Sequence, residues 1–243
     1  MVPGSVILET PVLQISQSAL GAIVTTEDGT RYRCKKAIVS IPTPSYKDIT
    51  FTPPLPLDKQ KYSSNTTLGY YAKMILLWDK PWWRKSGFCG MSQSFVGPSS
   101  VTRDTSDDQL GQFSLTCFIV GGPGRQWSEL NPEGRKEAIL SQLVTTFGKE
   151  HENEIRAPVE VFEQEWIKEA WSRGCPCPYT SPNLLTDVGN ALRQPFDAIH
   201  FVGTETSFEW KGYMEGAVRS GQRGAAEVIE ALRSKEGKIS AKL

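Results

Sequence analysis

Apolar and polar residues alternate through the first forty positions of the chain. The alternation runs from Val6 to Ser40 and breaks at turn signals such as Asp28-Gly29, which is typical of short strands joined in a meander. Prolines then punctuate residues 41–56 and predict a connection between two domains. We expect a short helix over residues 58–62.

Two later stretches repeat the strand pattern, and two others follow a helical one. Residues 70–78 and 113–120 predict strands, and Trp82-Trp83 predicts a turn onto a further strand. Residues 132–147 predict a helix that covers this second sheet, so the fold class is α/β of the mixed α+β kind. A last helix begins near Met214. Its predicted buried face consists of Ala217, Val218, Gly221, Ala225, Val228, Ile229 and Leu232.

Charge and cysteine content exclude several classes of function. The 27 basic side chains balance the 27 acidic ones, so no global field attracts nucleic acid or an anionic membrane. Five cysteines without a secretory leader predict reduced thiols. Cys175 and Cys177, with only the distant His151 and His200, lack the spacing of a zinc site, so we expect no metal. No apolar run approaches the roughly 20 residues that span a bilayer, so we expect no transmembrane segment.

The junction between residues 199 and 217 is the most informative part of the sequence. The apolar run Ile199 to Val202 ends at Gly203, and a helical pattern begins near Gly212. Backbone N–H groups and the positive end of the helix dipole would face the gap between them, which suits a phosphate-bearing cofactor. Residues 121–124, Gly-Gly-Pro-Gly, are interpreted as a turn, because the proline lacks an N–H donor and the third glycine of a dinucleotide fingerprint is missing.

Several motifs together resemble one enzyme family over nearly the whole chain. They are the run from Gly203-Thr204-Glu205-Thr206 to Gly212-Tyr213-Met214-Glu215-Gly216-Ala217, together with Ser172-Arg173-Gly174-Cys175, Leu192-Arg193-Gln194-Pro195, and Lys80-Pro81-Trp82-Trp83-Arg84-Lys85 with Cys89-Gly90. The sequence resembles the flavin-containing monoamine oxidases, in particular the fungal-type soluble amine oxidases.

The resemblance implies part of a two-domain FAD-linked amine oxidase fold. Residues 1–71 correspond to a β-meander segment of the FAD domain, 72–168 to the substrate-binding domain with its mixed sheet, and 169–243 to the C-terminal segment of the FAD domain. The family binds the ADP half of FAD with an N-terminal Rossmann βαβ unit. No Gly-x-Gly-x-x-Gly between a strand and a helix occurs in these 243 residues, so the sequence corresponds to the C-terminal portion of the family fold.

The resemblance also implies roles for individual residues. The resemblance implies that Lys73 holds a water against flavin N5. Strand alternation alone allows the alternative that the Lys73 side chain faces solvent. Tyr213 would form one wall of the substrate cage, but Pro176 stands where the family has the second aromatic ring, unless Tyr179 supplies it. Cys175 would carry a covalent FAD or be an inert thiol. The residues implied to contact the cofactor are Val6, Trp166, Cys175, Gly203, Thr204, Glu205 and Met214.

The implied function is FAD-dependent oxidative deamination of a primary or secondary amine. The partners of the protein would be a small amine and O2, with H2O2 as a product. A homo-oligomer is one assembly that the sequence allows. The C-terminal Ala241-Lys242-Leu243 resembles a peroxisomal address; without it a cytoplasmic location is expected. Two alternatives are a truncated, non-catalytic partner or regulatory module, and a related flavin oxidase acting on polyamines or amino acids.

Overall fold

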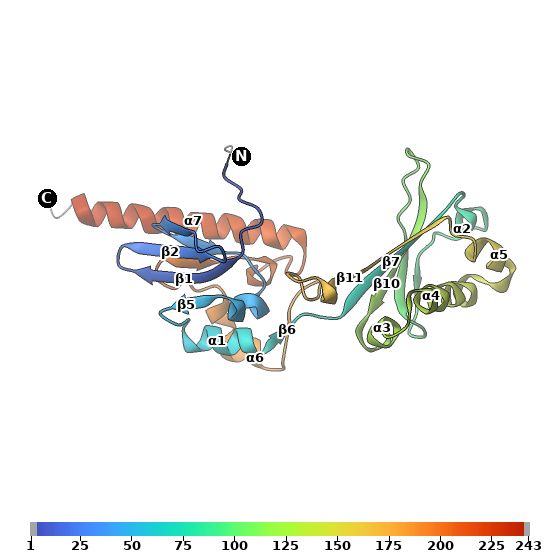
Figure 1. Ribbon diagram of the computed structural model, residues 1–243, viewed down its shortest axis with the longest axis horizontal. Coiled ribbons are helices and arrows are strands. Elements are labelled where there is room, and N and C mark those ends of the chain that lie inside the picture. The colour runs from blue at the N-terminus through green and yellow to red at the C-terminus, as the bar shows by residue number, and fades with distance from the viewer. Residues whose placement is uncertain (1–3, 241–243) are drawn as a thin grey trace. The chain divides into compact units, whose positions relative to one another are not determined.

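The computed structural model describes residues 4–240 of the chain, with side chains up to residue 234. The chain forms two compact units (Figure 1). Unit 1 comprises Met1–Thr67 and Cys177–Leu243, and unit 2 comprises Leu68–Pro176. The functional division at residues 71 and 168 that the sequence suggested stays a prediction.

The first sheet of unit 1 is the predicted meander, extended by one more strand. Its order is β3-β2-β1-β5, with β1 antiparallel to β2 and parallel to β5. Gly21 opens β2 with a positive φ of 137°, and a Cβ there would come within 2.3 Å of the Cys34 carbonyl oxygen, so the close approach requires glycine. The strands are β1 Val12–Ser18, β2 Gly21–Thr26, β3 Arg31–Cys34 and β5 Thr50–Thr52.

The proline-rich stretch lies inside unit 1, so the prediction of a connection between domains at residues 41–56 is wrong. The stretch includes the 3-10 helix η1, Thr43–Asp48, and leads to the helix α1, Leu57–Ser64. Tyr46 and Leu55 are buried in the same apolar core as Ile15 of β1. Burial of these side chains holds the stretch against the sheet, whereas its proline pattern alone is that of a surface connection.

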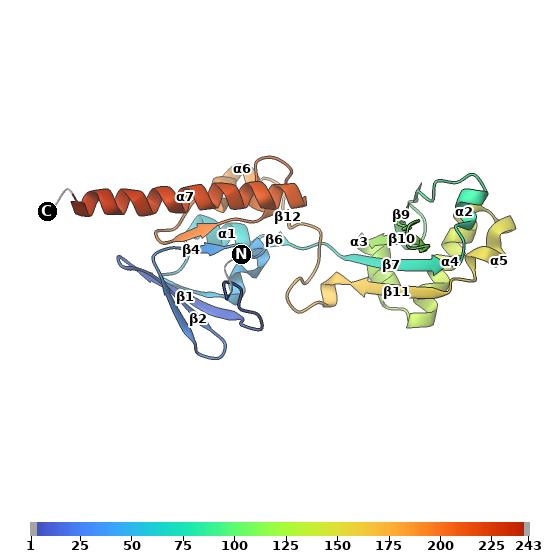
Figure 2. The same ribbon diagram turned by 90° about the horizontal axis from the view of Figure 1, so that it is seen from above.

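A second, two-stranded sheet leads to the junction noted in the sequence. Strand β4, Ala37–Val39, pairs in parallel with β13, Ile199–Phe201, and the helix α7, Met214–Ser240, packs along β13 (Figure 2). The other elements of this unit are β6 Thr66–Thr67, β12 Tyr179–Thr180, α6 Leu184–Val188, and the 3-10 helices η4 Gly189–Leu192 and η5 Thr204–Thr206.

The helix α7 is present as predicted, but its buried face is not the predicted one. Gly216, Ser220 and Gly224 are buried, whereas most of the predicted face is exposed, including Val218 at 55% and Ile229 at 49%. A Cβ at Gly216 would lie 2.3 Å from the Trp210 carbonyl oxygen, and one at Gly224 would lie 2.3 Å from Val202 Cγ1. These small residues at every fourth position let α7 lie close to Trp210 and Val202.

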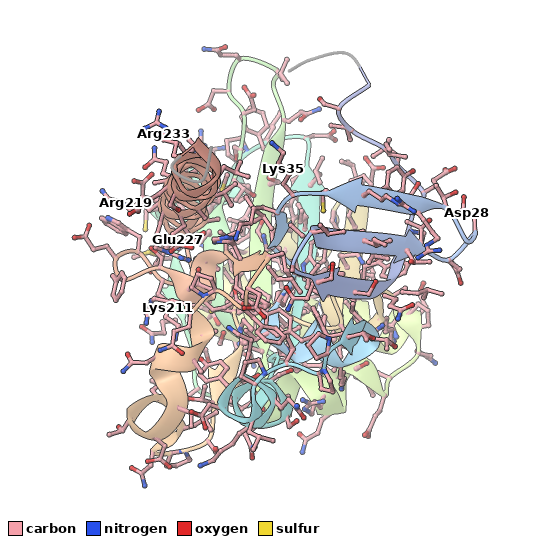
Figure 3. All side chains as sticks on the ribbon, turned by 90° about the vertical axis from the view of Figure 1, so that its left-hand side faces the viewer. Asp28, Lys35, Lys211, Arg219, Glu227 and Arg233 are labelled. Atoms are coloured by element: carbon pink, nitrogen blue, oxygen red, sulfur yellow. The ribbon has the colours of Figure 1, made fainter. Side chains whose placement is uncertain are left out.

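Figure 3 shows the two sides of α7. Arg219 and Arg233 point away from the strands, and both are exposed. Glu227 lies on the inner side, where its Oε2 is 3.2 Å from His200 Nδ1 on β13. A polar contact therefore completes the seat of this helix on the strand.

Unit 2 is built on a five-stranded sheet of order β11-β7-β10-β9-β8. The predicted strands at residues 70–78 and 113–120 are confirmed as β7 and β10, which pair antiparallel with Met74 opposite Cys117. The full set is β7 Tyr71–Trp78, β8 Ser92–Gln93, β9 Ser99–Asp104, β10 Phe113–Val120 and β11 Glu160–Glu165.

The helices of unit 2 cover one face of that sheet. Alternate residues of β7 and β10, such as Met74 and Leu115, are fully buried with Ile139 and Leu143 of α4. The predicted helix at 132–147 is confirmed, and the Asn131 side chain caps it by accepting a hydrogen bond from the Gly134 N–H at 2.8 Å. The helices are α2 Trp82–Lys85, α3 Gly121–Ser128, α4 Pro132–Phe147, α5 Glu152–Ile155, and the 3-10 helices η2 Lys149–His151 and η3 Trp166–Lys168.

Two local predictions in unit 2 need correction. The Trp82-Trp83 segment is a short helix rather than a turn, because both rings are buried and pack edge to face at 5.4 Å. Residues 121–124 are the first turn of α3 rather than a free turn. Pro123 is tolerated there, since the N–H groups of a first helical turn have no partner within the helix.

Candidate functional site

The strand-turn-helix of unit 1 is held closed by its own threonines. Gly203 has a positive φ of 125°, and the Thr206 N–H donates to its carbonyl at 2.9 Å. The hydroxyl of Thr204 accepts a hydrogen bond from the Gly212 N–H and donates one to the Tyr213 carbonyl, both at 2.8 Å. A single side chain therefore ties the start of α7 back to the turn that follows β13.

An exposed aromatic surface lies directly before α7. The rings of Trp210 and Tyr213 meet edge to face at 5.9 Å, and Met214 follows them. All three side chains are more than half exposed, at 58%, 66% and 89%. We call Trp210, Tyr213 and Met214 the aromatic shelf. Such a shelf can take up one face of a planar ring system.

Glu205 is a buried carboxylate within the turn. Its Oε1 accepts a hydrogen bond from the Thr43 N–H at 2.8 Å, which joins the turn to η1. Burial, together with this negative charge, raises the pKa of Tyr62 to about 12 and raises the pKa of Cys177. Within residues 4–240, Thr43 Oγ1 and Tyr46 Oη are buried without a hydrogen-bond partner. One Glu205 oxygen is therefore fixed by the Thr43 N–H, and the buried hydroxyls of Thr43 and Tyr46 belong to the same 3-10 helix η1.

Two arginines that the sequence analysis did not single out support the same turn. Arg223 of α7 donates from Nη2 to the Phe201 carbonyl and to Thr206 Oγ1, both at 2.9 Å. Arg193 donates from Nε to the Thr206 carbonyl at 2.8 Å and lies over the Phe208 ring. Arg193 belongs to a motif that carried the family resemblance, which was the available signal. Arg223 had none, because a single arginine in a polar helix is ordinary.

Lys73 lies on β7, on the face of the unit 2 sheet opposite the helices. It is half-buried, and its Nζ is 5.2 Å from the centre of the Phe118 ring, which belongs to its partner residue across β10. On the other side Gln164 of β11 is its partner. Lys73 therefore lies on the side of the sheet that the helices leave uncovered, as strand alternation allowed, and beside the Phe118 ring. Its role at a flavin stays a prediction.

Trp166, Cys175 and Pro176 lie near one another along the end of unit 2. The Trp166 carbonyl accepts a hydrogen bond from the Gly174 N–H at 3.0 Å, and the Cys175 N–H donates to the Gly69 carbonyl at 3.2 Å. The peptide bond from Cys175 to Pro176 is cis. Burial raises the pKa of the Cys175 thiol to about 11, although the positive charge of Lys73 acts in the opposite direction.

The predicted site residues thus fall into two groups. Gly203, Thr204, Glu205, Tyr213 and Met214 come together in unit 1, whereas Lys73, Trp166, Cys175 and Pro176 belong to unit 2. Val6 belongs to unit 1, where it is 57% exposed and lies before the first strand. Tyr179, proposed as a substitute ring, is 58% exposed on β12.

Comparison with known proteins decides the family. Residues 2–229 match the family described as "Flavin containing amine oxidoreductase". The chain belongs to this family. The predicted resemblance and the predicted mixed α/β amine oxidase fold are therefore confirmed for the flavin-containing amine oxidoreductases.

Related sequences cover the same stretch at moderate identity. The chain is 34% identical over 225 residues to "Probable flavin-containing monoamine oxidase A" of Dictyostelium discoideum, covering 93% of the chain and 48% of that protein. It is also 34% identical over 227 residues to "Amine oxidase [flavin-containing] B" of Homo sapiens, covering 93% of the chain and 43% of that protein. The chain therefore spans about half the length of the curated relatives it matches.

Solved structures of the family share the fold. Putrescine oxidase bound to putrescine superposes with a TM-score of 0.88 at 27% identity, over 94% of this chain and 50% of that one. Cyclohexylamine oxidase from Brevibacterium oxydans IH-35A gives 0.87 at 29% identity, over 93% and 49%. The likeness covers both units of this chain.

The residues present fit the flavin that names the family. The aromatic shelf offers apolar rings to a planar ring system, and it lies at the N-terminal end of the 27-residue helix α7, whose N–H groups favour an anionic group. Gly203 and Gly212 have positive φ values of 125° and 88°, and as glycines they place no Cβ between the backbone of this turn and a ligand.

Between residues 4 and 240, no helix has the length and apolarity to cross a bilayer. The predicted address Ala241-Lys242-Leu243 lies outside the described residues.

Proposed function

We propose that this chain forms the substrate-binding sheet and the C-terminal FAD-binding segment of an amine oxidase. The observation that carries the proposal is the turn from Gly203 to Met214, closed by Thr204 at 2.8 Å on both sides and ending in the aromatic shelf. FAD, when bound, would accept the electrons of the amine and pass them to O2. The products would be an imine, which water hydrolyses to an aldehyde, and H2O2.

The residues of the chain would bind and orient in this reaction. Tyr213 would present its exposed ring to the amine, and its backbone is fixed by Thr204. Lys73 would hold a water by donating from Nζ, with the Phe118 ring beside its charge. Orienting groups of this kind act by reducing the freedom of the reacting molecules and by placing dipoles in advance.

Other residues would hold the cofactor. Gly203, Thr204, Glu205 and Met214 would line it from unit 1, and Val6 would contact its adenine side. Trp166 would pack near the ring, and Cys175 would form a thioether to it. Pro176, in place of an aromatic residue, would leave one side of the substrate cage to another group.

The remaining proposals concern where and with what the protein works. The substrate would be a small primary or secondary amine, the second substrate O2, and the assembly a possible homo-oligomer. The peroxisomal address at the C-terminus would place the release of H2O2 in that organelle. The alternative proposal is a non-catalytic partner or regulatory module.

The test is reduction of bound flavin by an amine. The chain is joined to an N-terminal FAD-binding half from a family member, and flavin that survives gel filtration reports assembly; we call this product the reassembled enzyme. Anaerobic benzylamine should bleach the flavin absorbance, and O2 should restore it with one H2O2 per aldehyde. Bound flavin that no amine of a panel reduces would support the non-catalytic alternative instead.

A further inference from the structure

The helix-free face of the unit 2 sheet has a defined set of side chains. Antiparallel partners point to the same side of a sheet. Lys73 and Phe118 are partners, Ile75 and Thr116 are partners, and Thr116 is also the partner of Arg103 on β9. The contact of Tyr71 with the Phe118 ring at 6.0 Å confirms that these rows share a side. We call this the open face; it consists of Tyr71, Lys73, Ile75, Arg103, Thr116, Phe118, Phe162 and Gln164.

Arg103 is an uncompensated cation on the open face. It is exposed, and among the described residues it has no ion pair and no side-chain hydrogen bond. Its chain neighbour Asp104 points to the opposite side, where it accepts hydrogen bonds from Trp83 Nε1 at 2.8 Å and Arg84 Nε at 2.7 Å. The arginine therefore keeps its full hydrogen-bonding capacity for a ligand.

The carboxylates of the edge strand β11 do not neutralise Arg103. Glu163 and Glu165 are partners of Met74 and Ala72, so they lie on the helix-covered side. There Glu163 pairs with Arg135, and Glu165 accepts from Tyr70 Oη at 2.9 Å. Among the described strand residues of this sheet, Glu160 is the carboxylate on the open side, and it lies three strands away from Arg103. Glu169, which follows η3, accepts a hydrogen bond from Gln164 Nε2 at 2.6 Å on the β11 side of Lys73. On β7, β10 and β9, the strands from Lys73 to Arg103, the described residues of the open side include no carboxylate.

Hydroxyl groups border the arginine. Thr105 Oγ1 lies 2.9 Å from Ser114 Oγ and 2.8 Å from Thr116 Oγ1, and Thr116 is the strand partner of Arg103. Lys73 and Arg103 are two strands and one row apart, which places their Cα atoms roughly 12 Å from each other by ordinary sheet spacing. That separation suits the two ends of a small elongated molecule whose amine lies near Lys73.

We propose that Arg103 is a specificity-determining residue that binds an anionic group, a carboxylate, at the end of the substrate distal to the reacting amine. The proposal rests on the proposed amine oxidation. A guanidinium binds a carboxylate through two parallel N–H donors, and a second ammonium at the same place is repelled. Diamines are therefore poor substrates for this protein, in contrast to the solved relative that binds putrescine.

Three substrates of one shape test the proposal in the reassembled enzyme. They are benzylamine, 4-(aminomethyl)benzoate and 4-(aminomethyl)benzylamine, which differ in the charge opposite the amine. We expect kcat/KM for the carboxylate to exceed that for the diamine by about tenfold or more, mostly through KM. Arg103→Gln should bring the two kcat/KM values to within about twofold of each other, and Arg103→Lys should keep part of the preference for the carboxylate. Lys80→Gln, an exposed cation outside the open face, should leave it unchanged.

A binding measurement on the chain itself separates this proposal from the proposed function. In 15N-labelled chain, 4-(aminomethyl)benzoate should shift the amide signals of residues 101–104 and 116–118, and Arg103→Gln should abolish the shifts. Unmoved signals, or a substrate ratio that Arg103→Gln leaves intact, would overturn the role of Arg103. Flavin that none of the three amines reduces, with the shifts still present, would instead overturn the proposed oxidation.

Discussion

Lys59 Nζ lies 3.7 Å above the centre of the Phe201 ring, and both side chains are buried. The same ammonium donates to the carbonyls of Ala191 and Leu192. Phe201 ends the strand that leads into the Gly203 turn, so a buried amine supports the base of the candidate site. Burial and the positive charge of Arg223 lower the pKa of Lys59 from 10.5 to about 7.

This relationship predicts how stability depends on pH. Between about pH 7 and 10.5 the unfolded Lys59 carries a proton that the folded one lacks, so Lys59 should make the free energy of unfolding rise with pH. The rise should be clearest between about pH 7 and 8, because thiols with a raised pKa in the folded state, such as Cys175, act in the opposite direction at higher pH. The contribution is at most about 5 kcal/mol. Lys59→Met should flatten the rise in urea titrations at several pH values. Lys61→Met, at a half-exposed lysine of the same helix, should keep it; equal slopes for both variants would show that Lys59 titrates as an ordinary lysine.

Two glycines of α7 give opposite predictions for the same substitution. Gly216→Ala should destabilise unit 1 by about 2–4 kcal/mol, because the added Cβ would meet the Trp210 carbonyl oxygen at 2.3 Å and Thr204 Oγ1 at 2.8 Å. Gly221→Ala has nothing within 4 Å and should stabilise the helix by about 0.5–1 kcal/mol. Thermal unfolding measures both. A tolerated Gly216→Ala would mean that α7 does not approach the turn this closely.

Cys175 predicts a covalent flavin in the reassembled enzyme. Acid-precipitated protein should retain its flavin and the corresponding mass, Cys175→Ala should release the flavin, and Cys177→Ala should have no effect. Flavin extracted completely by acid would make Cys175 a packing residue. It would leave the role of the Gly203 turn untouched, because that turn belongs to unit 1.

The chain by itself is predicted to bind FAD weakly or not at all. Its 243 residues contain no glycine-rich strand-turn-helix of the kind that holds the pyrophosphate of a dinucleotide. The purified chain should therefore be colourless after gel filtration. A stoichiometric yellow protein would contradict this expectation and show that the remaining contacts suffice.

The sequence predicted those elements whose periodicity reports burial directly. The strands at 70–78 and 113–120 and the helix at 132–147 alternate or repeat in step with the side that packs. The family motifs marked the Gly203 turn, whose glycines adopt positive φ and whose Thr204 side chain forms hydrogen bonds to the backbone at Gly212 and Tyr213.

Where prediction was wrong, packing depends on residues that hydrophobicity does not mark. The helix α7 packs through Gly216, Ser220 and Gly224, so the larger apolar residues chosen from their spacing are mostly exposed. Lys59 can be buried because carbonyl oxygens far along the chain accept hydrogen bonds from its Nζ. Such contacts between distant segments leave no local pattern.

The rates of flavin reduction and reoxidation test the central claim most directly, namely that amine oxidation takes place at the face that carries Lys73. In the reassembled enzyme, Lys73→Met keeps the apolar bulk and removes the donor beside Phe118. Stopped-flow measurements with benzylamine and then O2 should show one half-reaction slowed by about tenfold or more, while Lys80→Met changes neither. Half-reactions of the Lys73→Met variant within about twofold of the parent would contradict the account.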